Sequence, residues 1–600
     1  MPQHALLKRK DVQTSDTWKL EDIFENDTLV EESIKRVKED LKAMLPYKGQ
    51  VTSSAATLFE VLEKSDKLSS LASKIYTYSH MRLHQDSNNS FYQDLASRSE
   101  ALLIEFGSAV SFIEPELSEL TEEEAEALLT ENDGLKLYTR YLSEILRQKE
   151  HILDSETENL LSQFAEVANA PSNIYAMLNN ADIKFPTIKD SEGHDVQITH
   201  GRFIQLLESK DVRVRKEAFK AVYNTYGSFK NTIATIFSSN VKQYGLFSRT
   251  KRFESPMHRA LSANNIPIDV YNNLISTVNS NLNLMHDYVA LRKEMLGVSE
   301  LHMYDLFVPM VNQFEKKISY EEACEIILEA LTPLGEDYVA IVREGFENRW
   351  VDRYENEGKR SGAYSWGTYD APHPFVLMNY VDNVNNMFTL AHEMGHALHS
   401  YLTSHTQPYP YADYCIFVAE VASTVNEALL MQHLLKTTKD ENYRKYLVNY
   451  FMEQFRTTLY RQTMFADFEK EVHNIAAKGM TLTADVLSET YYKLVKAYHG
   501  DAMCVDPEIA LEWARIPHFY TPFYVYQYAT GYSAAIALSN RILTEGATAV
   551  ADYKTFLSGG SSKDPIDLLK IAGVDMSSSQ PIEEALKVFE GLISEMKELI

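Results

Sequence analysis

Hydrophobic residues recur with helical spacing through most of this chain. Over residues 12–185 the helical periods are interrupted at Pro46, Pro115 and the Asn-Asp-Gly run at 132–134, and they resume over residues 201–248. Proline and Asn/Asp–Gly sequences end helices because they remove a backbone donor or favour a turn. The pattern therefore predicts a mainly α protein.

Two short stretches interrupt this helical pattern with features of β-structure. Around residues 183–198, β-branched residues flank an Asp-Ser-Glu-Gly turn, which predicts a hairpin. Residues 358–380 combine glycines, aromatic residues and β-branched residues. This combination predicts a small sheet whose glycines allow close backbone approach.

A candidate metal motif, His392-Glu393-Met394-Gly395-His396, lies in an uncharged stretch of predicted helix. Residues four apart share one helix face, so His392 and His396 can offer two imidazole nitrogens to one cation. Glu393 then stands beside the metal-bound water as its general base. The alternative is a polar helix face with two ordinary histidines. The uncharged flanks favour the metal, because such a group is costly to desolvate alone.

The third ligand distinguishes between classes of metallohydrolase. The metzincin pattern requires glycine at 399 and histidine at 402, whereas this chain has His399 and Leu402. The apolar segment 416–430 instead carries Glu420 and Glu427, which share a helix face because they are seven residues apart. We predict that Glu420 is the third ligand and that Glu427 lies behind it, hydrogen-bonded to a ligating imidazole. A helix-surface acid is the alternative for Glu427.

These residues resemble the thimet oligopeptidase and oligoendopeptidase F family of zinc peptidases, and the oligoendopeptidase F branch is the more similar. The resemblance rests on the pentapeptide at 392–396 and on Phe-Val-Ala-Glu-Val-Ala-Ser-Thr followed by Asn-Glu within 417–427. Two further blocks, 359–367 and 515–531, extend it. The four blocks occur in the family's order across about 170 residues.

The resemblance implies a helical ellipsoid with a deep substrate channel, a zinc ion at its floor and a small β-sheet beside the zinc helix. The chain divides best near residue 200, where helix resumes after the predicted hairpin without a flexible linker. Residues 1–200 are then an N-terminal helical domain, and the resemblance implies that it forms one channel wall. Residues 201–600 are the zinc metallopeptidase catalytic domain. Such a channel admits short unfolded peptides and excludes folded proteins.

The block at 515–531 contains one histidine and several tyrosines. By their number alone these residues are typical of a buried aromatic segment. The resemblance implies instead that a histidine and tyrosines donate hydrogen bonds to the oxyanion, and we assign this role to His518 with Tyr526 and Tyr524. The tyrosine register stays open, because thimet-type members have a glycine-rich loop where this chain has Phe-Tyr-Thr-Pro at 519–522.

Gly362 and Tyr364 lie in the predicted sheet and are our candidates for substrate binding. A peptide placed along an edge strand gains main-chain hydrogen bonds with little side-chain specificity, which suits a broad peptidase. A hairpin that only supports the zinc helix is the alternative.

Charge and cysteine content limit the partners. The net charge of −27, from 58 basic and 85 acidic residues, argues against nucleic acid and anionic membranes. The three cysteines have no metal-binding or redox spacing, the start of the chain has no signal-like apolar region, and no apolar run approaches the ~18 residues of a membrane helix. We therefore expect a cytoplasmic protein.

Taken together, the sequence predicts a zinc metalloendopeptidase with one Zn²⁺, acting on internal bonds of short unstructured oligopeptides through a Glu-activated zinc-bound water. A helical zinc carboxypeptidase is one alternative. A non-catalytic peptide-binding scaffold is another, and the intact Glu393 argues against it. The oligomeric state does not follow from the sequence.

Overall fold

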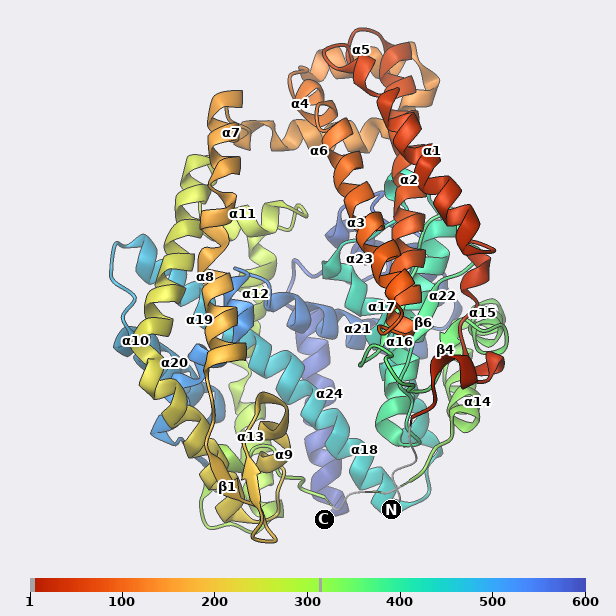
Figure 1. Ribbon diagram of the computed structural model, residues 1–600. Coiled ribbons are helices and arrows are strands. Elements are labelled where there is room, and N and C mark those ends of the chain that lie inside the picture. The colour runs from red at the N-terminus through yellow and green to blue at the C-terminus, as the bar shows by residue number, and fades with distance from the viewer. Residues whose placement is uncertain (1–5, 312–313, 315) are drawn as a thin grey trace. The chain divides into compact units, whose positions relative to one another are not determined.

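The computed structural model describes residues 6–311, 314 and 316–600, and it consists mainly of helices with a few short strands (Figure 1). This confirms the predicted mainly α fold. The chain forms two units, each assembled from three segments. Unit 1 comprises Met1–Glu150, Glu315–His433 and Leu538–Gly573, and unit 2 comprises His151–Phe314, Leu434–Ala537 and Val574–Ile600.

Unit 1 combines the N-terminal helices with a three-stranded sheet. Two helices, α17 (Ile416–Thr437) and α21 (Tyr526–Glu545), contain the divisions at 433/434 and 537/538. The other elements of unit 1 are α1 (Asp27–Lys42), α2 (Ala55–Gln85), α3 (Ser90–Val110), α4 (Ile113–Ser118), α5 (Glu122–Glu131), α6 (Thr139–Gln148), α14 (Tyr320–Ala330), α15 (Glu336–Glu347), β4 (Val351–Asp352), β5 (Tyr364–Trp366), β6 (Phe375–Leu377), α16 (Val384–Thr406), α22 (Ala547–Leu557) and α23 (Pro565–Ile571).

The helix boundaries in unit 1 agree with the predicted interruptions. Pro46 follows α1 in a short 3₁₀ turn, and Pro115 lies in the first turn of α4. The side chain of Asn132 accepts a hydrogen bond from the Gly134 amide directly after α5 ends. Apolar residues of α1, α2 and α3 then form one core with Phe375 of β6, so the sheet packs onto the N-terminal helices.

The sheet of unit 1 has the strand order β4-β6-β5, with β4 parallel and β5 antiparallel to β6. Its central strand β6 is buried at all three residues. Both β5 and β6 pack against α16, the helix that carries the candidate metal motif. The predicted small sheet beside this helix is confirmed, and β5 is one of its edge strands.

Unit 2 is built around the long helix α10 (Val212–Thr250), which packs against α8, α9 and α20. Two antiparallel strands, β1 and β2, form the predicted hairpin. The other elements are α7 (Ser155–Gln163), α8 (Ala165–Met177), β1 (Thr187–Lys189), β2 (Asp195–Gln197), α9 (His200–Leu207), α11 (Pro256–Ser262), α12 (Ile268–Ser280), α13 (Leu282–Leu296), β3 (Leu301–His302), α18 (Glu441–Gln454), α19 (Arg461–Ala477), α20 (Ala484–His499), β7 (Met503–Cys504) and α24 (Gln580–Leu599).

Two irregular segments of unit 2 carry residues that are discussed below. A π-helical segment, Phe455–Tyr460, joins α18 to α19, and a 3₁₀ segment, Pro507–Arg515, packs against α10 and α20. Residue 200 lies inside unit 2, so the division into 1–200 and 201–600 is not a division between the two units and stays a prediction. In the described part of the chain, no helix has the length and apolar character needed to cross a membrane.

Candidate metal centre

Helix α16 presents the two motif histidines on one face. Asn383 caps its start, where its side chain accepts a hydrogen bond from the Asn386 amide at 2.8 Å. Three turns later the rings of His392 and His396 lie with centroids 4.8 Å apart. The helix therefore sets the separation of the two nitrogen donors without help from a loop.

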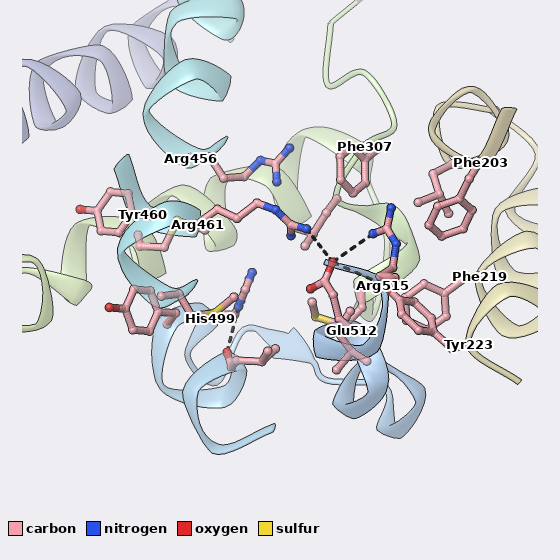
Figure 2. Close-up of a pocket in the computed structure, with 18 residues that line it drawn as sticks. Phe203, Phe219, Tyr223, Phe307, Arg456, Tyr460, Arg461, His499, Glu512 and Arg515 are labelled. Atoms are coloured by element: carbon pink, nitrogen blue, oxygen red, sulfur yellow. Dashed lines mark hydrogen bonds and ion pairs between the residues drawn. The ribbon is translucent and has the colours of Figure 1, made fainter. Parts of the chain in front are cut away.

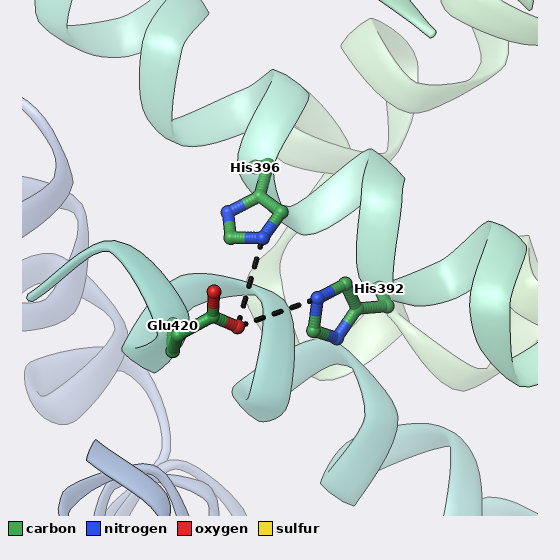
Figure 3. A group of neighbouring side chains, drawn as sticks. All are labelled: His392, His396 and Glu420. Carbon is green, nitrogen blue, oxygen red and sulfur yellow. Dashed lines mark ion pairs between the residues drawn. The ribbon is translucent and has the colours of Figure 1, made fainter. Parts of the chain in front are cut away.

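Glu420 of α17 completes a three-residue group (Figure 3). Its Oε2 lies 3.4 Å from His392 Nε2 and 3.8 Å from His396 Nε2. The possible ligand atoms of the three residues all lie within 4.8 Å of one another. The structure thus brings together the three residues that the sequence nominated as metal ligands.

Gly395 explains how α16 and α17 approach closely enough for this. A Cβ atom at this position would lie 2.5 Å from Ser423 Cα and 2.7 Å from the Ala422 carbonyl oxygen, both on the backbone of α17. These are atoms that cannot move aside as a flexible side chain can. Any residue larger than glycine would push the two helices apart and move Glu420 away from the histidines.

A buried amide also connects the two helices, and the sequence reasoning missed it. Asn426 of α17 donates from Nδ2 to the Ala391 carbonyl at 3.2 Å and accepts from the Tyr338 hydroxyl at 3.1 Å. Asn426 is fully buried, so these hydrogen bonds satisfy groups that would otherwise be costly. An asparagine within an apolar helix was the available signal.

The second nitrogen of each histidine is already occupied. His392 Nδ1 lies 2.6 Å from Glu427 Oε1, which is the position predicted for Glu427. A hydrogen bond joins the His396 ring to the Ala419 main chain. Both imidazoles therefore turn Nε2 toward Glu420, and such outer hydrogen bonds commonly fix the orientation of metal-binding histidines.

The electrostatics of this group favour a cation. Burial lowers the pKa of His392, but Glu427 and the other carboxylates outweigh burial and raise it to about 9. Burial, together with the charge on His392, lowers the pKa of His396 to about 3. Burial raises the pKa of Glu393 to about 7, helped by Glu420. Two imidazoles and a carboxylate form a donor set that suits zinc, so the residues present fit that ion.

Glu393 faces the edge strand of the sheet. It is 7% exposed and accepts a hydrogen bond from the main chain of Ser365 in β5. A cavity of about 580 Å³ in unit 1 also includes Ser365 in its wall. Five aromatic rings contribute to the wall of this cavity: Tyr76, Trp366, Tyr369, Tyr409 and Tyr414.

The two predicted substrate residues lie at the start of this edge strand, Gly362 two residues before it and Tyr364 as its first residue. Gly362 has φ +84°, a conformation that favours glycine, and its carbonyl accepts from Asn379 Nδ2 at 2.8 Å. Tyr364 is half-buried, and its hydroxyl lies 2.8 Å from His84 Nδ1. Both residues belong to the strand region that runs past Glu393.

The predicted oxyanion donors lie in unit 2 and form a group of their own. His518 is exposed, and its ring lies 6.2 Å from the rings of both Tyr524 and Tyr528. The two tyrosine hydroxyls are 3.5 Å apart. Tyr526 instead is buried, with its ring 5.0 Å from that of Tyr271. The local geometry therefore groups Tyr528, rather than Tyr526, with His518 and Tyr524.

A buried acid, Glu469 of α19, supports the backbone before these tyrosines. It accepts a hydrogen bond from the Phe523 amide at 2.6 Å, and Phe523 has the left-handed φ of +58° that non-glycine residues rarely adopt. Burial raises the pKa of Glu469 to about 8, although this hydrogen bond lowers it. The sequence reasoning did not single out Glu469. Its position four residues after Phe465 and three before Val472, on the apolar face of α19, was the only signal.

Two family models match the chain. One, described as peptidase family M3, matches residues 205–588. The other, described as oligopeptidase F, matches residues 116–185.

Relatives of known name extend over the whole chain. Oligopeptidase PepF of Bacillus subtilis is 50% identical over 597 residues, which covers 100% of this chain and 89% of that protein. Group B oligopeptidase PepB of Streptococcus agalactiae is 39% identical, covering 99% of this chain and 98% of that protein.

Solved structures share the fold. A crystal structure from Chlamydophila abortus matches with a TM-score of 0.92 at 32% identity, covering 99% of this chain and 100% of that chain. The crystal structure of oligoendopeptidase-F from Enterococcus faecium matches with a TM-score of 0.74 at 37% identity, covering 96% and 99%.

Proposed function

Because the chain belongs to peptidase family M3, which makes it a peptidase of the oligopeptidase F type, we propose that it is a zinc-dependent endopeptidase of short unstructured peptides. The observation that carries the proposal is the close group of His392, His396 and Glu420 beside Glu393. Family membership gives the reaction class, and this group supplies the chemistry for it.

His392, His396 and Glu420 are the residues that would hold one zinc ion. Zinc supplies Lewis-acid polarisation of the scissile carbonyl and makes water a nucleophile near neutral pH. Glu427 holds the His392 ring through Nδ1, and the Ala419 main chain holds the His396 ring. The two Nε2 atoms would therefore be held in a fixed orientation for the ion, which would raise affinity by avoiding rearrangement on binding.

Glu393 is the general base of the proposed mechanism. The charges of His392 and Glu420 both act on its pKa, which supports a position close to the ligand group. It takes a proton from the attacking water and delivers it to the nitrogen of the leaving amine. The hydrogen bond from the Ser365 main chain holds the carboxylate toward the edge strand.

We assign the hydrogen-bond donors for the oxyanion to His518, Tyr524 and Tyr528. Peptide hydrolysis develops negative charge on the carbonyl oxygen, and neutral donors stabilise it. Partial burial of the ring lowers the pKa of His518, which favours the neutral imidazole with one N–H to donate. Tyr526 was nominated from the sequence, and its burial against Tyr271 favours Tyr528 in its place.

The substrate lies along β5 in this proposal, with Gly362 and Tyr364 on its path. An edge strand offers unpaired main-chain groups to an extended peptide. The aromatic cavity next to Ser365 accepts one apolar side chain of that peptide. Oligopeptides as partners and a cytoplasmic location complete the proposal.

Zinc content and cleavage of a peptide blocked at both ends test the proposal. We expect about one zinc per chain and cleavage at internal bonds. Glu393→Gln should retain zinc and lose about 10²–10⁴-fold in kcat. Glu489→Gln, the same substitution at an exposed position of α20, is the matched control and should leave both unchanged.

The alternatives give different results in the same experiment. A helical zinc carboxypeptidase would leave the blocked peptide intact and release residues from a free C-terminus. A peptide-binding scaffold would bind the peptide without cleaving it. Full activity of Glu393→Gln would contradict the assigned base.

A further inference from the structure

Unit 2 contains a small cavity, of about 30 Å³, that lies away from the metal motif in the sequence and has a charged wall (Figure 2). A space of this size holds about two water molecules or a single small ion, since a cavity measured in this way needs about 10–15 Å³ for one water. Most of its wall is apolar and aromatic. The charged groups in the wall are Arg456, Arg461, Arg515 and Glu512.

Glu512 has no further capacity to balance charge. Its Oε1 accepts from Arg461 Nη2 at 2.6 Å and from Arg515 Nη1 at 3.3 Å, and these two side chains converge on it in Figure 2. The hydroxyls of Tyr491 and Tyr223 also donate to it, at 2.6 and 3.4 Å. Burial raises the pKa of Glu512, but Arg461 and Arg515 outweigh burial and lower it to about 2. Glu512 therefore contributes one full negative charge.

The third guanidinium of the wall shares its carboxylate with a fourth. Arg456 donates from Nε and Nη2 to Glu453 Oε2 at 2.9 and 2.7 Å, and Arg292 donates to Glu453 Oε1 at 3.1 Å. Among the described residues no other carboxylate forms an ion pair with these four arginines, which are Arg292, Arg456, Arg461 and Arg515. Four guanidinium groups thus face two carboxylates.

This excess positive charge cannot be removed by deprotonation. Arginine stays charged at any physiological pH, whereas a buried lysine or histidine can lose its proton. His499, also in the wall, shows that behaviour, because burial lowers its pKa to about 4. Arg456 is nearly inaccessible, at 4% exposure. Arg461 and Arg515 keep 23% and 20% of their side chains exposed, so the penalty falls mainly on Arg456. A buried charge that shares its counter-charge is unfavourable, and the excess therefore favours a bound anion.

The backbone directs two of these arginines, Arg456 and Arg461, toward the cavity. Arg456 lies in the π-helical segment and Arg461 follows it, five residues later. Five-residue spacing matches the hydrogen-bond repeat of a π-helix, so the segment brings both guanidinium groups to the cavity. In the described residues neither Arg456 Nη1 nor Arg461 Nη1 donates a hydrogen bond to a protein acceptor. These donors are available to a ligand.

We propose that this cavity binds one small monovalent inorganic anion, such as chloride, between the guanidinium groups of Arg456, Arg461 and Arg515. The small volume favours a monatomic anion over a phosphate or an organic carboxylate. The apolar remainder of the wall suits a weakly hydrated halide. The ion neutralises part of the excess charge and stabilises unit 2. The inference is independent of the proposed peptidase reaction.

Thermal unfolding tests the proposal on the unaltered protein. We compare roughly 100 mM chloride with gluconate at the same ionic strength and pH, because gluconate is too large for the cavity. Bound chloride should raise Tm by about 2–4 °C. Crystals grown in bromide should show anomalous scattering between the three guanidinium groups. An unchanged Tm together with no bromide signal means that only water fills the cavity and overturns the proposal.

A matched pair of variants locates the effect. Arg456→Met keeps a similar volume against Phe307, removes one positive charge and leaves Glu453 paired with Arg292. We expect its chloride-dependent rise in Tm to fall by at least half. Arg444→Met removes an arginine of α18 that pairs with Glu595 and should keep the full rise. A full rise in folded Arg456→Met contradicts the site. If that variant does not fold, the bromide experiment decides.

Discussion

The chain buries charge at two places with opposite excess. In unit 1 the motif histidines lie among three carboxylates, Glu393, Glu420 and Glu427. In unit 2 four guanidinium groups share Glu453 and Glu512. The excess of carboxylates in unit 1 suits a cation, and the excess of guanidinium groups in unit 2 suits an anion. In each group, the excess of one charge indicates a ligand of the opposite charge.

The two groups differ in what happens when the ligand is absent. Carboxyl and imidazole groups can take up or release protons, and the raised pKa values of Glu393 and His392 show this response. Arginine has no such response at physiological pH. We therefore expect unit 1 to lose its ion with little loss of stability. We expect unit 2 to lose stability when Glu453 or Glu512 is removed.

The largest expected effect is that of Glu512→Gln. The change leaves Arg461 and Arg515 without their carboxylate and should lower the free energy of unfolding by about 3–5 kcal/mol. Chemical denaturation measures it. Glu595→Gln, which breaks the half-exposed pair with Arg444, should cost about 0–1 kcal/mol. If both variants lower the free energy of unfolding equally, Glu512 stabilises the protein no more than an ordinary surface ion pair does.

Glu469→Gln tests a buried acid that lacks a cationic partner. The folded pKa of about 8 exceeds the ordinary 4.5, so the folded protein holds this proton more tightly than the unfolded chain. Stability is complete below pH ~4.5 and falls as pH rises toward 8. Tyr271 and Tyr244, which face Glu469, remain protonated in this range because burial raises their pKa values.

A glutamine has no charge to bury, so the variant should gain about 3 kcal/mol relative to the parent protein between pH 5 and pH 8. Unfolding in denaturant across this range measures the difference. Exposed Glu489→Gln should show no pH-dependent difference from the parent. A constant difference for Glu469→Gln would mean that Glu469 is ionised in the folded protein.

Tyr528→Phe tests the assignment of Tyr528 as a donor to the oxyanion. Loss of one oxyanion donor should lower kcat about 100-fold with little change in KM. Tyr526→Phe is the control in the same helix, and its buried position predicts a change in stability rather than in kcat. The reverse order of effects would restore Tyr526 as the acting tyrosine.

The smallest expected effect belongs to Glu427→Gln. It weakens the contact with His392 Nδ1 and should reduce zinc affinity about 10–100-fold. Competition with a chromogenic chelator measures the affinity. Glu329→Gln, at an exposed position of α14, should bind zinc as the parent does. Unchanged affinity in Glu427→Gln would make Glu427 a purely structural acid.

Local sequence was sufficient for the fold class, the small sheet and the family. Helical spacing, the breaks at Pro46 and Pro115, and the hairpin depend on neighbouring residues and agree with the structure. The motif histidines also needed only helix geometry, because a separation of four residues fixes their common face. The resemblance to the oligoendopeptidase F family is confirmed by the full-length relatives.

Features that depend on contacts between distant segments could not be predicted in this way. The alternation of tyrosines in the block at 515–531 gave no reason to choose between Tyr526 and Tyr528, since their burial depends on what packs against α21. The sequence reasoning also missed Asn426 and Glu469, because a buried polar residue acquires its role from the partner that it bonds.

The sequence by itself determined a mainly helical chain of the peptidase M3 family and nominated His392, His396 and Glu420, because these inferences need only short-range geometry and a recognisable motif. Tertiary structure alone decided the approach of α17 at Gly395 and the gathering of four arginines around two carboxylates. Packing and charge compensation act between residues that are far apart in the chain, so no local sequence pattern predicts them.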